Sequence, residues 1–140
     1  MIGPRFSLLL PAIGFLVLPL TLAGCGKKEP ANVVHVSGTA TYKGQPIPLG
    51  MIVFEPDPAQ GNKGTQGHAE IKNGKFDTRL SEKGAVVGPS IVRITGGDGA
   101  APEPFSPLGK MLFAEYTTRV NLSRDKTALS FDVPVAVSRR

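Results

Sequence analysis

Residues 36–56 read VSGTATYKGQPIPLGMIVFEP, and their pattern decides the fold class. Polar and small or apolar residues alternate before the KGQP tetrapeptide, and the alternation resumes after Gly50, where Ile52 and Phe54 share a face. An apolar residue at every second position is typical of a strand with one buried face. Within the tetrapeptide, Gly44 can adopt a positive φ and Pro46 fixes its own φ. The segment therefore predicts two β-strands joined by a turn.

The same alternation extends on both sides of this segment. The first strand is expected to begin at Val33, with an inner face of Val34, Val36, Ala40 and Tyr42. Further inner faces are expected at Ala69 and Ile71; Phe76, Thr78 and Leu80; Val92 and Ile94; Val120 and Leu122; and Leu129, Phe131 and Val133. The best helical candidate, residues 108–116, is barely two turns long. The pattern predicts an all-β domain, a single antiparallel seven-stranded β-sandwich, with a small open barrel as the alternative.

Asn73-Gly74 is a strong signal for a two-residue hairpin turn. Such a turn would place Ile71 opposite Phe76 and Glu70 opposite Asp77. Two carboxylates in direct opposition are unfavourable, so either a cation lies between them or neighbouring basic side chains relieve the repulsion. Lys72, Lys75 and Arg79 are close enough in sequence to favour the second interpretation.

The chain also resembles the transthyretin-like, carboxypeptidase-regulatory-type domains. The matching positions are Gly38, Gly44, Pro46, Gly50, Ile52, Phe54 and Pro56. IKNGKFDT at 71–78 and VVGPSIVRITG at 86–96 resemble later segments of that family. The resemblance implies a transthyretin-like or immunoglobulin-like sandwich. The sequence departs from the family pattern at Ser90, where the family usually has a tyrosine that fills one end of the sandwich.

Hydrolases of 5-hydroxyisourate share this fold, but they depend on a histidine and arginine set and on a C-terminal Tyr-Arg-Gly-Ser motif. This sequence reads VPVAVSRR at its end, and neither His35 nor His68 lies in a comparable context. Both histidines are expected on polar strand faces, where two alone do not make a metal site. Ser90 lacks the glycine spacing of a nucleophile elbow. No catalytic residue, no metal ligand and no enzymatic activity is therefore expected.

The first residues have the layout of a signal peptide. One arginine, Arg5, precedes an apolar run over 6–20, and a polar stretch follows at 26–30. A single membrane-spanning helix over 6–24 is the competing interpretation, although its prolines and glycines weaken it. Residues 1–24 are therefore predicted to be a signal peptide.

Leu22, Ala23, Gly24 and Cys25 resemble a bacterial lipobox, in which the cysteine thiol receives a diacylglycerol and the chain is cut just before it. Cys25 is the one cysteine of the 140 residues, and a lone thiol in an exported protein is otherwise a liability. A lipoprotein anchored through Cys25 is predicted, with a tether over 25–32 and one domain over 33–140. Gly26, in place of the aspartate common in inner-membrane lipoproteins, favours the outer membrane or the cell surface. The whole chain is similar to small lipoproteins that are numerous in planctomycete bacteria.

The longest segment without strand periodicity, residues 96–117, is unusually apolar. It contains Phe105, Met111, Leu112, Phe113 and Tyr116, and burial of each such side chain is worth about 1.5–3 kcal/mol. The segment is expected to cap the end of the sandwich at Ser90, or else to form an interaction patch. Asp98 among glycines is expected to be a turn residue rather than a calcium ligand.

The formal net charge of +5 is modest, and scattered charges argue against nucleic-acid binding. The expected function is that of a membrane-anchored envelope lipoprotein, with no cofactor beyond the diacylglycerol. Its non-catalytic domain would serve as a structural or interaction module for an envelope protein or glycan. The alternative is a small-ligand or glycan-binding lipoprotein, which the absence of tryptophan disfavours.

Overall fold

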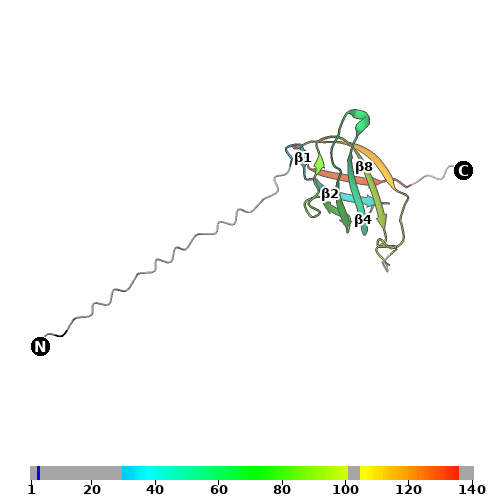
Figure 1. Ribbon diagram of the computed structural model, residues 1–140. Coiled ribbons are helices and arrows are strands. Elements are labelled where there is room, and N and C mark those ends of the chain that lie inside the picture. Colours follow the sequence, from blue (N-terminus) through cyan, green and yellow to red (C-terminus); the bar gives the residue numbers. More distant parts are fainter. Residues whose placement is uncertain (1–2, 4–29, 101–104, 136–140) are drawn as a thin grey trace.

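The computed structural model describes residues 3, 30–100 and 105–135 of the chain (Figure 1). The lipobox residues Leu22, Ala23 and Gly24, the lipidation candidate Cys25 and nearly all of the expected signal peptide lie outside these residues. Their roles therefore stay predictions. Among the described residues, no helix has the length and apolar character needed to cross a membrane.

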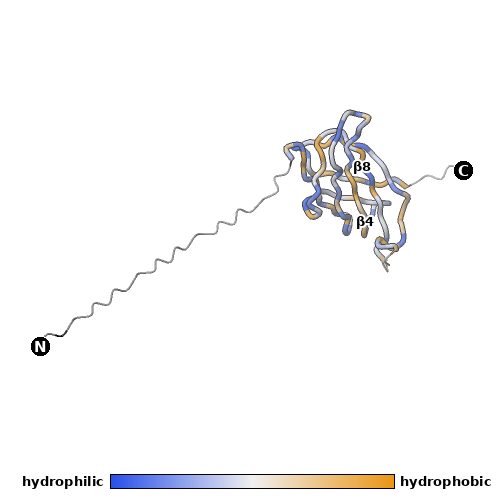
Figure 2. Tube along the Cα trace, viewed as in Figure 1, coloured by the Kyte–Doolittle hydropathy of each residue, from blue (hydrophilic) through white to orange (hydrophobic). Residues whose placement is uncertain are grey.

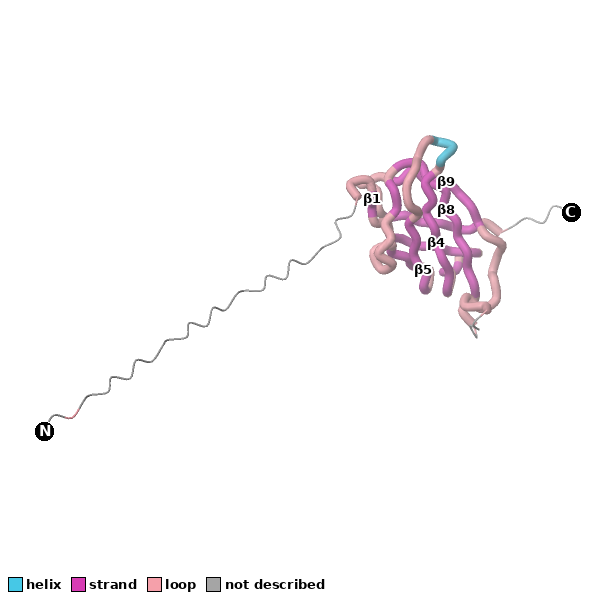
Figure 3. Tube along the Cα trace, in the orientation of Figure 1, coloured by secondary structure: helices cyan, strands magenta, loops and turns pink. Residues whose placement is uncertain are grey.

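The described part of the chain is all-β, as the alternating pattern predicts. Its elements are β1 (Val33–Val34), β2 (Ser37–Tyr42), β3 (Gln45–Pro46), β4 (Leu49–Pro56), the 3-10 helix η1 (Pro58–Gln60), β5 (Gly67–Lys72), β6 (Lys75–Asp77), β7 (Ala85–Val86), β8 (Gly88–Gly97), β9 (Tyr116–Leu122) and β10 (Ala128–Val133). Residues 108–115, within the best helical candidate of the sequence, form a loop, and Tyr116 begins β9. Figure 3 shows strands and loops with η1 alone in helix colour.

Most strands belong to one curled sheet, in the order β10-β2-β6-β5-β4-β8-β9, and β3 pairs with β2. A second, two-stranded sheet joins β1 to β7. The purely antiparallel seven-stranded arrangement is wrong in one respect: β10 runs parallel to β2, with Ala128 opposite Ser37 and Val133 opposite Tyr42. Parallel neighbours need a long connection between them, and here almost the whole domain supplies it.

The curl brings the two halves of the sheet face to face. In Figure 1, β2 runs across the direction of β4 and β8. The aromatic rings of Phe54 in β4, Phe76 in β6 and Phe131 in β10 lie between these halves, with centroids 6.0–6.4 Å apart. Figure 2 shows apolar residues along β4 and β8 and polar residues in many of the turns. The result is a sandwich-like domain with one aromatic core.

The predicted inner faces are largely correct. In β4, buried and partly exposed residues alternate without interruption, and Ile52 and Phe54 are fully buried. Leu80 is the exception, since its side chain is 87% exposed. Strand β6 ends at Asp77, and Leu80 N donates to the Asp77 carbonyl in a turn, so the strand alternation no longer applies there.

The Asn73-Gly74 turn is confirmed, with φ of 50° and 74° and with Lys72 paired to Lys75. The predicted opposition of Glu70 and Asp77 is wrong, because the β5–β6 ladder consists of that single pair. Glu70 lies opposite Met51 in β4, and Asp77 lies opposite Ser37 in β2.

Strand β8 runs from one end of the domain, here called the proximal end, to the opposite, distal end. Its first residue, Gly88, follows β7, whose Val86 pairs with Val33, so the chain enters the domain at this proximal end. The last residue, Gly97, pairs with Leu49 at the distal end. At about 3.3 Å per residue, the ten residues of β8 separate these ends by roughly 30 Å. Figure 1 shows β1 and the described part of the β8–β9 loop on opposite sides of the domain.

Candidate functional site

A cleft lies at the distal end of the domain, between the β2–β3 turn and the β8–β9 loop. It has a volume of about 540 Å³, within the range of small-ligand and peptide pockets. Its lining consists of Tyr42, Lys43, Gln45, Pro46, Pro48, Asp98, Lys110, Met111 and Leu112. One wall comes from the end of β2, the β2–β3 turn, β3 and Pro48, and the other comes from the β8–β9 loop.

The first wall is anchored by Ile47, which is fully buried. Ile47 N donates to the Ala40 carbonyl, and Gly74 N donates to the Ile47 carbonyl at 2.7 Å. The flanking Pro46 and Pro48 are exposed, and neither has an N–H to satisfy. Burial of the central isoleucine therefore holds two proline rings at the edge of the cleft.

The second wall is held by a short ladder on the end of β8. The Asp98 carboxylate accepts hydrogen bonds from Ala100 N at 2.9 Å and from Lys110 N at 3.0 Å. Leu112 N donates to the Gly96 carbonyl at 3.0 Å, and Met111 forms a bridge with Gly97. Asp98 is thus a turn residue, as expected, and its bonds fix Met111 and Leu112 beside the cleft.

Phe113 joins the two walls. Its ring packs against Tyr42, with centroids 4.9 Å apart and planes tilted by 47°. A Cβ atom at Gly96 would lie 2.9 Å from the Phe113 ring, so the ring fits because residue 96 has no side chain. Tyr116 is also half-buried and packs on the core.

The expected cap over Ser90 is wrong. Ser90 pairs with Pro56 and Val120 near the proximal end of β8, whereas the loop leaves β8 at Gly97. Ser90 is itself buried, and its hydroxyl donates to the Gly88 carbonyl at 3.3 Å.

The apolar residues of the predicted interaction loop fall into two groups. Leu112, Phe113 and Tyr116 are half-buried. Met111 is 48% exposed, and Phe105 is fully exposed at 101%. The loop therefore packs against the distal end of its own domain and still presents apolar surface to solvent.

The distal end also carries basic side chains. Lys43 Nζ lies 5.2 Å from the centre of the Tyr42 ring, a cation–π arrangement. Lys43, Lys75 and Lys110 form no ion pair with a described carboxylate, whereas Lys72 pairs with Glu70. The carboxylate of Asp98 is engaged by backbone N–H groups. The cleft consequently has apolar walls and two lysines that remain open to an anionic partner.

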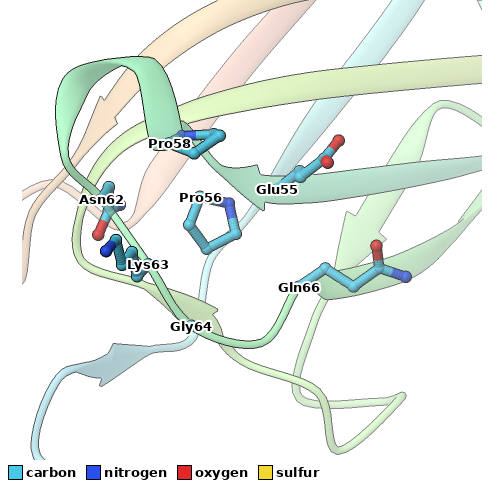
Figure 4. Close-up of a pocket in the computed structure, with 7 residues that line it drawn as sticks. All are labelled: Glu55, Pro56, Pro58, Asn62, Lys63, Gly64 and Gln66. Carbon is cyan, nitrogen blue, oxygen red and sulfur yellow. The ribbon is translucent and has the colours of Figure 1, made fainter.

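A second, smaller cleft of about 350 Å³ lies at the proximal end (Figure 4). Its lining is Glu55, Pro56, Pro58, Asn62, Lys63, Gly64 and Gln66. Figure 4 shows Pro56, Pro58, Asn62 and Lys63 gathered around the turn after β4. Asn62 Nδ2 donates to the Pro89 carbonyl at 2.8 Å, which ties this turn to β8.

Asp57 organises that turn, and sequence reasoning missed it. Its side chain is buried and accepts from Ala59 N at 3.0 Å, Gln60 Nε2 at 3.2 Å and Arg119 Nε at 3.2 Å. The signal was an Asp-Pro pair directly after a strand, because aspartate is a preferred N-cap and proline a preferred first residue of a helical turn.

Arg93 lies between two carboxylates on the outer face of the sheet. It donates to Glu55 and to Glu115, each at 3.1 Å. The hydrogen bonds to Glu55 and then to Glu115 raise the pKa of the guanidinium. The group is exposed, so this network contributes little to stability.

The remaining polar candidates have structural partners. Thr78 Oγ1 accepts from Val36 N at 2.9 Å and lies 3.2 Å from His35 Nδ1. His68 is half-buried in β5. The carboxylates of Glu70 and Asp77, which do not face each other, are paired with Lys72 and Arg79 respectively. Residues 30–100 and 105–135 contain no group of three His, Cys, Asp or Glu side chains that could hold a metal ion.

The distal cleft is therefore the arrangement best suited to contact another molecule. It combines two proline rings, Met111 and Leu112 with lysines that have no carboxylate partner in the described domain. Comparison of the chain with protein-family models, with curated proteins and with solved structures finds no match.

Proposed function

We propose that the protein is a cell-envelope lipoprotein whose domain acts as a non-catalytic interaction module. In this account residues 1–24 are a signal peptide that is removed, and Cys25 carries a diacylglycerol. Residues 25–32 then tether the domain to the outer membrane or the cell surface. The support is the apolar leader, the Leu22-Ala23-Gly24-Cys25 sequence and the presence of one cysteine in the chain.

The observation that carries the interaction role is the position of the distal cleft. The chain enters the domain at β1, roughly 30 Å along β8 from the residues that line the cleft. A domain held at its entry point would direct this cleft away from the membrane. Two or three acyl chains are enough for stable anchoring, so the domain itself need not contact lipid.

The domain is proposed to be a transthyretin-like sandwich. The support is the glycine and proline spacing of residues 38–56, together with a sheet that curls around one aromatic core. The non-catalytic role is supported by the buried polar side chains. Asp57, Thr78 and Ser90 each hydrogen-bond to the backbone or to a neighbouring side chain, so these groups hold the fold together.

Binding of a small ligand or glycan is the second candidate. The volume of the distal cleft, about 540 Å³, and the presence of Tyr42 in its lining favour it. The cleft has only this one aromatic residue on which a sugar could stack.

Affinity capture from cross-linked envelopes tests the proposal. Tagged full-length protein should retain a defined protein neighbour, and Cys25→Ser protein should lose it because the domain is no longer held at the membrane. Recovery of the same neighbour with the Cys25→Ser variant would show that the interaction does not depend on anchoring through Cys25. Recovery of no protein with the wild type would favour the small-ligand alternative.

A further inference from the structure

The chemistry of the distal cleft defines the kind of partner that it fits. Lys43 stands on the β2–β3 turn and Lys110 on the β8–β9 loop, so the two ammonium groups come from opposite walls. Neither pairs with a described carboxylate, and both residues are exposed. Lys75 follows Gly74, whose N–H bonds to the Ile47 carbonyl, and adds at the same end a third cation that has no partner among the described carboxylates.

The walls between these cations are apolar. Pro46 and Pro48 form one side, and Met111 and Leu112 form the other. The charged residues of the lining are Lys43, Lys110 and Asp98, and the Asp98 carboxylate already accepts two backbone hydrogen bonds. The four apolar residues suit an apolar side chain better than a sugar, which needs hydrogen-bonding groups and aromatic faces. Met111 is flexible and polarisable, and methionine is common at surfaces that adapt to peptide side chains.

Charge disfavours the chain's own C-terminal residues as occupants. Val133 pairs with Tyr42, so the chain leaves the domain beside the cleft. The sequence that follows carries Arg139 and Arg140 and no acidic residue. Cationic residues would meet Lys43 and Lys110 with like charge, whereas carboxylates would complement them.

We propose that the distal cleft binds an extended acidic segment of a partner protein. An apolar side chain of that segment lies between Pro46 and Pro48 on one side and Met111 and Leu112 on the other. Carboxylates on either side of it pair with Lys43 and Lys110. This inference rests on the interaction role proposed above and gives the partner its chemical class.

Selection from a displayed library of random dodecapeptides tests this inference. The bait is full-length protein in detergent micelles, with a Lys43→Glu/Lys110→Glu variant and a matched Lys63→Glu/Lys83→Glu variant that changes two exposed lysines outside the cleft lining. The wild type should enrich peptides with an apolar residue flanked by Asp or Glu. Affinity for the best peptide should fall roughly tenfold or more with the first variant and stay nearly unchanged with the second.

The other outcomes overturn the inference in distinguishable ways. No enrichment, or equal binding to both lysine variants, would show that the cleft does not read acidic peptides. Displacement of the peptide by polygalacturonate at equal carboxylate concentration would assign the site to an anionic glycan. Displacement by a peptide of residues 134–140 would assign it to the chain's own end. If one of these results were obtained while the envelope capture still recovered a protein neighbour, the interaction role would stand. Only the acidic segment as partner would then be rejected.

Discussion

The ring of Phe113 lies 4.9 Å from the ring of Tyr42, which fastens the β8–β9 loop to the end of β2. This contact determines the shape of the distal cleft, because Leu112 precedes Phe113 and Lys43 follows Tyr42, and both line the hollow. The loop is thus a wall of the cleft that the aromatic pair and the backbone hydrogen bonds to the end of β8 hold together, and the Phe113 ring fits because Gly96 has no side chain.

Phe113→Ala should lower the free energy of unfolding by about 2 kcal/mol. The ring is half-buried, so the cost is expected below the 3–5 kcal/mol of a fully buried phenylalanine. Loss of the aromatic pair with Tyr42 adds to the loss of buried area. Urea unfolding of the full-length protein measures the change.

Phe105→Ala is the matched control, because Phe105 belongs to the same loop and is fully exposed. Its unfolding free energy should stay within about 0.5 kcal/mol of the wild type. Equal costs for the two variants would mean that the Phe113 contact does not stabilise the domain.

Gly74→Val should destabilise the domain by more than 1 kcal/mol. Gly74 has a φ of 74°, which a β-branched residue adopts poorly, and its Cβ would lie 2.6 Å from Pro46 Cβ. Gly44→Val is the comparison, because Gly44 has a φ of 73° but no atom within 4 Å of the added Cβ. The difference between their melting midpoints isolates the steric clash. Equal midpoints would show that the hairpin tip is not packed against Pro46.

Asp57→Ala should cost about 2 kcal/mol, because the change removes an N-cap and leaves Ala59 N and the side chain of Gln60 without their acceptor. Asp125→Ala, at an exposed turn residue, should change stability by less than about 0.5 kcal/mol. Chemical denaturation compares the two. A neutral Asp57→Ala would mean that the turn after β4 does not need its buried carboxylate.

Cys25→Ser should prevent lipidation and leave an uncleaved precursor or a soluble exported form. The thiolate is the nucleophile that forms the thioether bond to the diacylglyceryl group, and a serine hydroxyl is far less nucleophilic near neutral pH. Mass spectrometry of the purified chain distinguishes these products from a processed, acylated protein. Acylated protein from the variant, or a native mass that retains residues 1–24, would reject the lipoprotein account.

Much of the fold followed from period-two alternation, because a strand with one buried face leaves that pattern in local sequence. The Asn73-Gly74 turn was predictable for a similarly local reason, since both residues tolerate a positive φ. The parallel pairing of β10 with β2 was not predictable, because the two strands lie far apart in the chain and the alternation carries no information on direction. Leu80 was misplaced because the strand ends before it.

The site was only partly predictable. The apolar content of residues 105–116 indicated that the loop must be covered, and Phe113 and Tyr116 are indeed packed on the core. Which end the loop covers depends on where β8 ends, and Gly97 places that point far from Ser90. The sequence did not indicate that Pro46 and Pro48 line a cleft. Burial of Ile47 between them positions the prolines, and a single buried residue outside the alternating pattern leaves no periodic signal.

Photo-cross-linking in cells tests the central claim most directly, namely that a membrane-anchored domain presents its distal cleft to a protein partner. A photoreactive phenylalanine analogue is placed at Met111 in the distal cleft or at Lys63 in the proximal cleft, and each protein is expressed with Cys25 intact. The analogue at position 111 should yield a defined cross-linked protein, and the analogue at position 63 should not. A cross-link to the same protein from position 63 alone, or no protein cross-link from position 111, would contradict the account.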